Sequence, residues 1–127
     1  MNLVITPELS LIGYPPKDLL FNPRLFEEEK DVLNKLSKRL SNLSQNLSVL
    51  IGIAEPTPDI EIPKLYNSVV LLEKGTWRIV ARKQLLPTYD VFDEKRYFRS
   101  AENSSILSFN FQKELWKIGI TICEDIW

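Results

Sequence analysis

Short runs of apolar residues alternate with polar segments along most of the chain, and their length predicts β-strands. The runs hold about four to seven residues and are rich in Val, Ile and Leu. Uninterrupted apolar runs are typical of strands that are covered on both faces of a sheet. We therefore predict strands at 3–6, 48–54, 66–72, 76–81, 106–109 and 116–122, and we expect those at 3–6, 48–54 and 116–122 to be buried.

One stretch has a different period. After Asn22 and Pro23, apolar residues recur every three or four positions from Leu25 to Leu47, and lysines and arginines occupy the other side. This spacing indicates an amphipathic helix with one face on a sheet. Asn is favoured as the capping residue and Pro at the first helical position. We predict a helix that begins at Pro23 and packs on the strands.

The connections complete the expected architecture. Residues 73–75, Glu-Lys-Gly, predict a hairpin turn in which Gly75 takes a positive φ. Residues 55–63 hold three prolines, so we expect a connector without regular structure there. Strands outnumber helices, but the long helix after the first strand favours a layered α/β or α+β fold.

Composition narrows the classes of function. The 127 residues carry 16 Lys and Arg against 17 Asp and Glu, so the chain lacks the positive charge that attracts nucleic acids or anionic membranes. No apolar run approaches the ~20 residues that span a bilayer, and the first residues lack a signal-peptide pattern. One cysteine cannot form an internal disulfide. We expect a cytoplasmic protein with no nucleic-acid or membrane partner.

The candidate chemistry rests on three residues that each follow an apolar run. Cys123 follows the last predicted strand, Glu8 follows the first, and Lys83 follows the hairpin. The chain has no histidine, so a cysteine nucleophile would need another base, and a desolvated Glu8 could serve. Lys83 could stabilise an oxyanion and lower the pKa of the thiol. With no histidine and no cluster of carboxylates, no metal site is predicted.

Each of these residues also has a simpler interpretation. A lone cysteine is usually a small buried residue, a carboxylate at a strand end is usually solvated, and a lysine after a strand is usually a surface charge. Tyr89, Phe92, Asp93 and Glu94 form a compact loop that could line a pocket, or could be a turn with an aromatic anchor. The order of the segments and their flanking residues decide between these interpretations.

Three segments carry a family resemblance. They are residues 7–19 around Glu8, residues 83–98 after Lys83, and Cys-Glu-Asp-Ile-Trp at 123–127. Together they resemble the nitrilase, or carbon-nitrogen hydrolase, superfamily, which uses a Glu-Lys-Cys triad in this chain order. The Glu-Asp-x-Trp ending narrows the resemblance to the glutaminase domain of glutamine-dependent NAD synthetases.

The resemblance implies a role for each residue. Glu8 would be the general base, Lys83 would stabilise the tetrahedral intermediate, and Cys123 would form a glutamyl thioester. Glu94 would be a supporting glutamate, and Tyr14 and Tyr89 would be pocket tyrosines. The backbone amide of Glu124 would share the oxyanion hole with Lys83. The ammonia released from glutamine would serve the ATP-dependent amidation of deamido-NAD.

The resemblance also implies how the chain is organised. We expect residues 1–127 to be a partial carbon-nitrogen hydrolase domain, truncated at both ends, with part of a nitrilase-like α-β-β-α sandwich that becomes four-layered when two domains associate. A synthetase domain would lie outside this chain and would hold the ATP and magnesium; no cofactor is expected here. We expect glutamine as substrate, a synthetase domain or parent polypeptide as partner, and a homo-oligomer when complete.

Two other interpretations stay open at this point. The chain could be an amidase of another nitrilase branch that acts on a small amide. It could also be an inactive truncated remnant, or an interaction surface, because its outer strands would expose unpaired edges.

Overall fold

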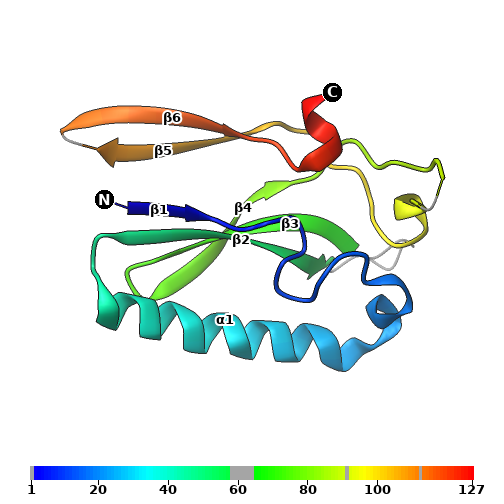
Figure 1. Cartoon of the computed structure of the whole chain (residues 1–127), viewed down its shortest axis with the longest axis horizontal. Coiled ribbons are helices and arrows are strands. Elements are labelled where there is room, and N and C mark those ends of the chain that lie inside the picture. The colour runs from blue at the N-terminus through cyan, green and yellow to red at the C-terminus, as the bar shows by residue number, and fades with distance from the viewer. Residues whose placement is uncertain (1, 58–64, 91, 112) are drawn as a thin grey trace.

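The fold is built from a helix, a four-stranded sheet and a two-stranded sheet stacked on one another (Figure 1). The computed structural model describes residues 2–57, 65–90, 92–111 and 113–127. The strands are β1 (Asn2–Ile5), β2 (Leu47–Pro56), β3 (Leu65–Glu73), β4 (Thr76–Arg82), β5 (Ser105–Phe111) and β6 (Glu114–Ile120), and the helix is α1 (Pro23–Leu43). Three short 3-10 helices, η1 (Lys17–Phe21), η2 (Glu94–Arg96) and η3 (Cys123–Ile126), lie in the connections. The α/β class is confirmed.

The helix begins as its sequence predicts and ends earlier. The Asn22 side chain accepts a hydrogen bond from the backbone N–H of Arg24 at 3.1 Å, and Pro23 is the first helical residue. Ser44 has extended backbone and closes the helix after Leu43. The prediction that Leu47 continues the apolar face is therefore wrong, because Leu47 opens β2 instead. In the described part of the chain, no helix is long and apolar enough to cross a bilayer.

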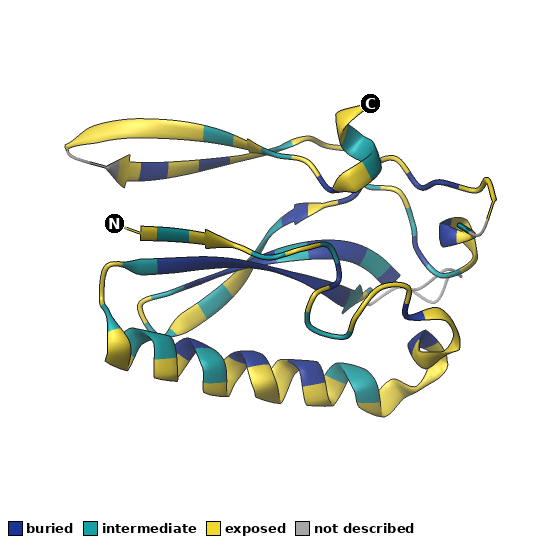
Figure 2. Cartoon of the chain, viewed as in Figure 1, coloured by how far each residue is buried: buried dark blue, intermediate teal, exposed yellow. Residues whose placement is uncertain are grey.

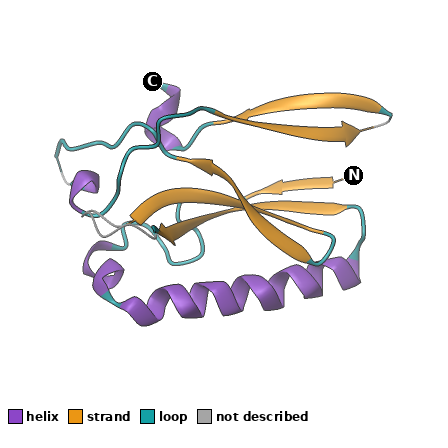
Figure 3. Cartoon of the chain, turned by 180° about the vertical axis from the view of Figure 1, so that it is seen from behind, coloured by secondary structure: helices purple, strands orange, loops and turns teal. Residues whose placement is uncertain are grey.

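The large sheet has the strand order β1-β2-β3-β4, with β1 parallel to β2 and the other neighbours antiparallel. Alternate residues of a strand point to opposite faces, so β2 contributes to two cores. Val49 and Ile51 pack with Leu33 of α1, whereas Leu50 packs with Phe109 of β5 on the other face. Viewed from behind, the helix and the β5-β6 hairpin lie on opposite sides of the sheet (Figure 3).

The expected burial is correct for β2 and wrong for β1 and β6. Most of β2 is buried, whereas β1 and β6 are largely exposed (Figure 2). Ile5 of β1 is 70% exposed, and Leu115 of β6 is 63% exposed. β1 is an edge strand outside the area that α1 covers, and β6 belongs to a hairpin that packs through one face. An apolar run indicates that a strand tends to be buried, but it does not identify the element that packs on the strand.

One connection differs from its prediction and another agrees with it. The register of β2 with β3 continues through Glu55 and Pro56, so the expected irregular connector starts later than residue 55. Proline is tolerated there because it stands at the end of the strand. Residues 58–64 lie outside the described residues. The turn between β3 and β4 is the expected hairpin, and Lys74 as well as Gly75 has a positive φ, at 50° and 80°.

Candidate active site

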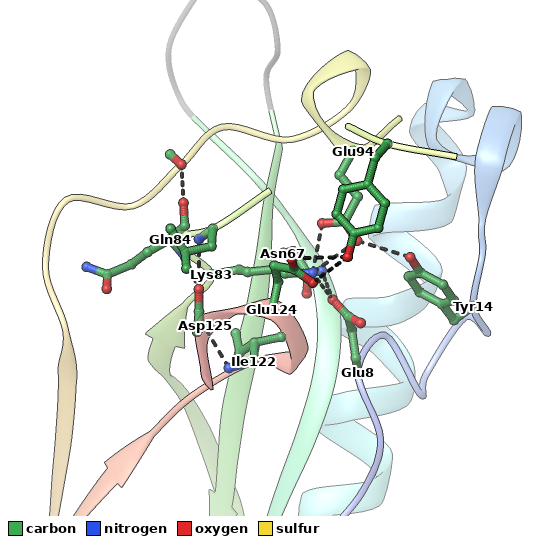
Figure 4. A network of polar contacts seen from close by, with 12 residues as sticks. Glu8, Tyr14, Asn67, Lys83, Gln84, Glu94, Ile122, Glu124 and Asp125 are labelled. Carbon is green, nitrogen blue, oxygen red and sulfur yellow. Dashed lines mark hydrogen bonds and ion pairs between the residues drawn. The ribbon is translucent and has the colours of Figure 1, made fainter. Parts of the chain in front are cut away.

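The three candidate catalytic residues follow the ends of three different strands. Glu8 comes three residues after β1, Lys83 directly follows β4, and Cys123 begins η3 just after β6. Glu8 and Cys123 line the same cavity, of about 100 Å³. The fold thus brings Lys83 into contact with Glu8 (Figure 4), and Cys123 lies beside Glu8 in their shared cavity.

Lys83 is the buried centre of this cluster. Its side chain is 0% exposed, and its Nζ donates to Glu8 Oε1 at 2.7 Å and to Glu94 Oε1 and Oε2 at 3.0 and 2.9 Å. Burial alone lowers the pKa of Lys83, but the hydrogen bonds to Glu8 and Glu94 outweigh it, so the pKa is raised. Lys83 therefore stays charged, and the simpler interpretation of a surface lysine does not hold.

Glu94 supports Lys83 from η2. It is 5% exposed, and it accepts a hydrogen bond from the Tyr14 hydroxyl at 3.1 Å in addition to those from Lys83. Burial raises the pKa of Glu94, and Lys83 opposes that change. Burial and the neighbouring Glu94 also raise the pKa of Tyr14, so this phenol remains a hydrogen-bond donor. The structure thus brings Glu94 against the Lys83 ammonium, and Tyr14 against Glu94.

Cys123 stands at a backbone turn with φ 47°, a conformation that non-glycine residues rarely adopt. Its thiol is exposed. Desolvation raises the pKa of Cys123 first, followed by the charge of Glu8 and a hydrogen bond to it, while the charge of Lys83 lowers it. Lys83 acts in the expected direction on the thiol pKa, but desolvation and the charge of Glu8 outweigh it, so the pKa is raised. A neutral thiol must lose its proton during the reaction, and Glu8 lines the same cavity and can accept it.

Tyr89 and Glu124 meet at the outer rim of the site. The Tyr89 hydroxyl donates to both carboxylate oxygens of Glu124 at 3.1 Å, and Tyr89 is 57% exposed. Phe92 lies between Tyr89 and Tyr14, with ring centroids 5.7 and 6.3 Å away. Phe92, Asp93 and Glu94 line a cavity of about 190 Å³ together with Tyr14, so most of the loop predicted to form a pocket does line one.

Two residues that support Glu8 were missed in the sequence. Asn67 of β3 is 1% exposed; its Nδ2 donates to Glu8 Oε1 at 2.6 Å, and its backbone carbonyl accepts from the N–H of Lys83 at 2.8 Å. Gly52 of β2 lies directly beneath the segment of Glu8. The signal that could have identified Asn67 was the polar pair Asn67 and Ser68 within an otherwise apolar strand. Gly52 left no signal within its apolar run.

Comparison with known proteins shows which family the chain belongs to. The sequence pattern of the family described as carbon-nitrogen hydrolase matches residues 1–127. The chain is 44% identical over 129 residues to the glutamine-dependent NAD(+) synthetase of Synechocystis, covering 99% of this chain and 22% of the relative. It is 36% identical over 126 residues to the synthetase of the same name from Thermotoga maritima, covering 99% of this chain and 20% of that one.

Solved structures give the same result. The structure of a glutamine-dependent NAD+ synthetase from Acinetobacter baumannii, in complex with ADP, superimposes with a TM-score of 0.77 at 36% identity, covering 98% of this chain and 22% of that one. A carbon-nitrogen hydrolase from Helicobacter pylori matches with a TM-score of 0.56 at 24% identity, over 80% of this chain and 34% of that one, which shows the shared fold. The chain spans about a fifth of the length of the synthetases that it matches. It belongs to the carbon-nitrogen hydrolase family.

Proposed function

We propose that the chain hydrolyses the side-chain amide of glutamine through a thioester on Cys123. The observation that carries this proposal is the cavity that Cys123 and Glu8 line together, with the buried ammonium of Lys83 hydrogen-bonded to Glu8. A nucleophile, a base and a cation within one cluster are the groups that acyl transfer requires.

In the first half-reaction, the Cys123 sulfur attacks the amide carbon while its proton passes to Glu8. Negative charge then develops on the former carbonyl oxygen, where the Lys83 ammonium and the backbone N–H of Glu124 would stabilise it. Glu8 gives the proton to the amide nitrogen, the C–N bond breaks, and ammonia leaves. As Glu8 is neutralised by the proton, the attraction of Lys83 shifts from this carboxylate to the oxyanion.

In the second half-reaction, water attacks the thioester carbon. Glu8 takes a proton from the water, the C–S bond breaks, and the proton returns to the departing sulfur. Glutamate is released and the Cys123 thiol is regenerated. Glu94 keeps Lys83 in place through both steps because it accepts two hydrogen bonds from the ammonium, and Tyr14 holds Glu94 by donating to it.

The names of the relatives suggest where the ammonia goes. We propose that residues 1–127 are part of a glutaminase domain, and that the ammonia supplies an ATP-dependent amidation of deamido-NAD at the synthetase domain of a longer polypeptide. ATP and magnesium would act in that domain. Glutamine and the synthetase domain are then the partners of this chain, and association into a homo-oligomer would complete the four-layered sandwich.

Two alternatives give different results with purified chain. An amidase of another branch would turn over acetamide or propionamide faster than glutamine. An inactive remnant would release ammonia from none of them. The similarity to proteins whose names specify glutamine favours glutamine over other small amides.

The test of the mechanism is Glu8→Gln, with the exposed Glu28→Gln of α1 as the matched control. Turnover of glutamine should fall about 10²–10⁴-fold, because the base is absent. The midpoint of Cys123 alkylation by iodoacetamide should move to lower pH, because the charge of Glu8 no longer raises the thiol pKa. Retained turnover in Glu8→Gln, or no glutamate from the unmodified chain, would contradict the proposal.

A further inference from the structure

The backbone directly after Lys83 leaves the sheet and finds its partner elsewhere. β4 ends at Arg82, so the N–H groups of Gln84 and Leu85 lie beyond its pairing with β3. Both donate to one atom, Oδ1 of Asp125, at 3.0 and 2.7 Å (Figure 4). This carboxylate therefore fixes the backbone next to the buried ammonium of Lys83.

The other oxygen of Asp125 holds the turn of the nucleophile. Oδ2 accepts from the N–H of Ile122 at 3.1 Å, and the N–H of Asp125 itself donates to the Ile122 carbonyl at 3.2 Å. Cys123 lies inside the loop that these bonds close, at φ 47°. A non-glycine residue keeps such a backbone conformation only when its surroundings hold it there.

A carboxylate is the side chain that suits this position. Three backbone N–H groups converge on Asp125, two on one oxygen and one on the other. A carboxylate accepts on both oxygens, whereas an asparagine amide has an acceptor on one side and an NH₂ donor on the other. In either orientation, Asn would point its NH₂ group at a backbone N–H.

We infer that Asp125 is a positioning residue that ties the Cys123 turn to the Lys83 segment, and so sets the distance between the nucleophile and the cation. The inference deepens the proposed glutaminase function and rests on it for its effect on turnover. Loss of this tie would let the thiol move out of the cluster of Glu8 and Lys83. A displacement of ~1 Å can cost about 10²-fold in rate.

Asp125→Asn tests the inference, with Asp31→Asn on the exposed surface of α1 as the matched control. Turnover of glutamine should fall about 10²-fold. The pH midpoint of Cys123 alkylation by iodoacetamide should fall toward that of an ordinary thiol, because desolvation and the charge of Glu8 raise the thiol pKa in the intact site. An unchanged alkylation midpoint would overturn the inference, whether or not the melting temperature falls. A residue that only stabilises the fold would lower the melting temperature without changing this midpoint.

The inference can still be tested if the unmodified chain is inactive or if the variant does not fold. If the unmodified chain does not hydrolyse glutamine, the proposed function fails, while the alkylation midpoints of the two chains still test the tie. If Asp125→Asn does not fold, hydrogen exchange in the unmodified chain decides. The amides of Gln84, Leu85 and Ile122 should be protected although they lie outside the strands, and exchange of the Gln84 and Leu85 amides at the rate of an unstructured peptide would overturn the inference.

Discussion

Gly52→Ala should disable the site without touching any group that reacts. A Cβ at position 52 would lie 2.4 Å from the backbone nitrogen of Leu9 and 2.8 Å from the carbonyl oxygen of Pro7, whereas ordinary contact begins near 3.4 Å. The obstructing atoms belong to backbone and cannot rotate away. β2 cannot recede either, because Gly52 is paired with Val69 of β3. The segment of Glu8 must therefore move by about 1 Å.

That displacement sets the size of the effect. Moving a catalytic base by ~1 Å can cost about 10²-fold in rate, and overpacking of this kind costs about 1–3 kcal/mol of stability. The assay is initial-rate glutamate formation at saturating glutamine, on chain shown by its thermal melt to be folded at the assay temperature. We expect kcat to fall about 10²-fold relative to the unmodified chain.

The control is Gly119→Ala on β6, where an added Cβ meets no atom within 4 Å. This variant makes the same chemical change without a clash and should keep its rate within about twofold, well inside the margin of a single surface substitution. A Gly52→Ala chain with the same kcat as Gly119→Ala would refute the argument that Gly52 supports the base.

Two further substitutions probe buried polar groups. Asn67→Leu removes the donor to Glu8 and should lower kcat by about 10- to 100-fold, since a hydrogen bond to a charged group contributes about 1.5–3 kcal/mol; activity equal to that of the exposed Asn103→Leu would count against it. Glu29→Gln concerns stability: burial raises the pKa of Glu29 to about 7, so its neutral form stabilises the fold below pH 4.5, and this contribution is lost as pH rises toward 7. The free energy of unfolding, measured with urea at pH 5 to 8, should rise in the variant relative to the unmodified chain by up to about 3 kcal/mol across that range. A difference between the two chains that does not change with pH would contradict this prediction.

The elements were predictable because they depend on local pattern. Asn22 and Pro23 start the helix wherever it packs, and the turn at Gly75 requires a positive φ in any context. Burial was harder to predict because it depends on distant neighbours. Ile5 and Leu115 stand in strands as apolar as β2, yet they are exposed, because each has a face or an edge without a partner in the described structure.

The same distinction applies to the site. Glu8, Lys83 and Cys123 could be singled out because they follow apolar runs and sit within family motifs. Burial of Lys83 could not be foreseen, because it is made possible by two carboxylates 75 and 11 residues away in sequence. Asp125 was visible only as part of a motif, since its partners Gln84 and Leu85 are 41 and 40 residues distant.

The central claim is that Cys123 is the nucleophile of a glutamine pocket. Its most direct test is intact-mass detection of covalent labelling by an electrophilic glutamine analogue, with and without competing glutamine, and with Cys123→Ser as control. We expect rapid labelling at Cys123 that glutamine suppresses and that the variant lacks. Slow labelling that is indifferent to glutamine would contradict it, because an exposed thiol outside a pocket reacts in that way.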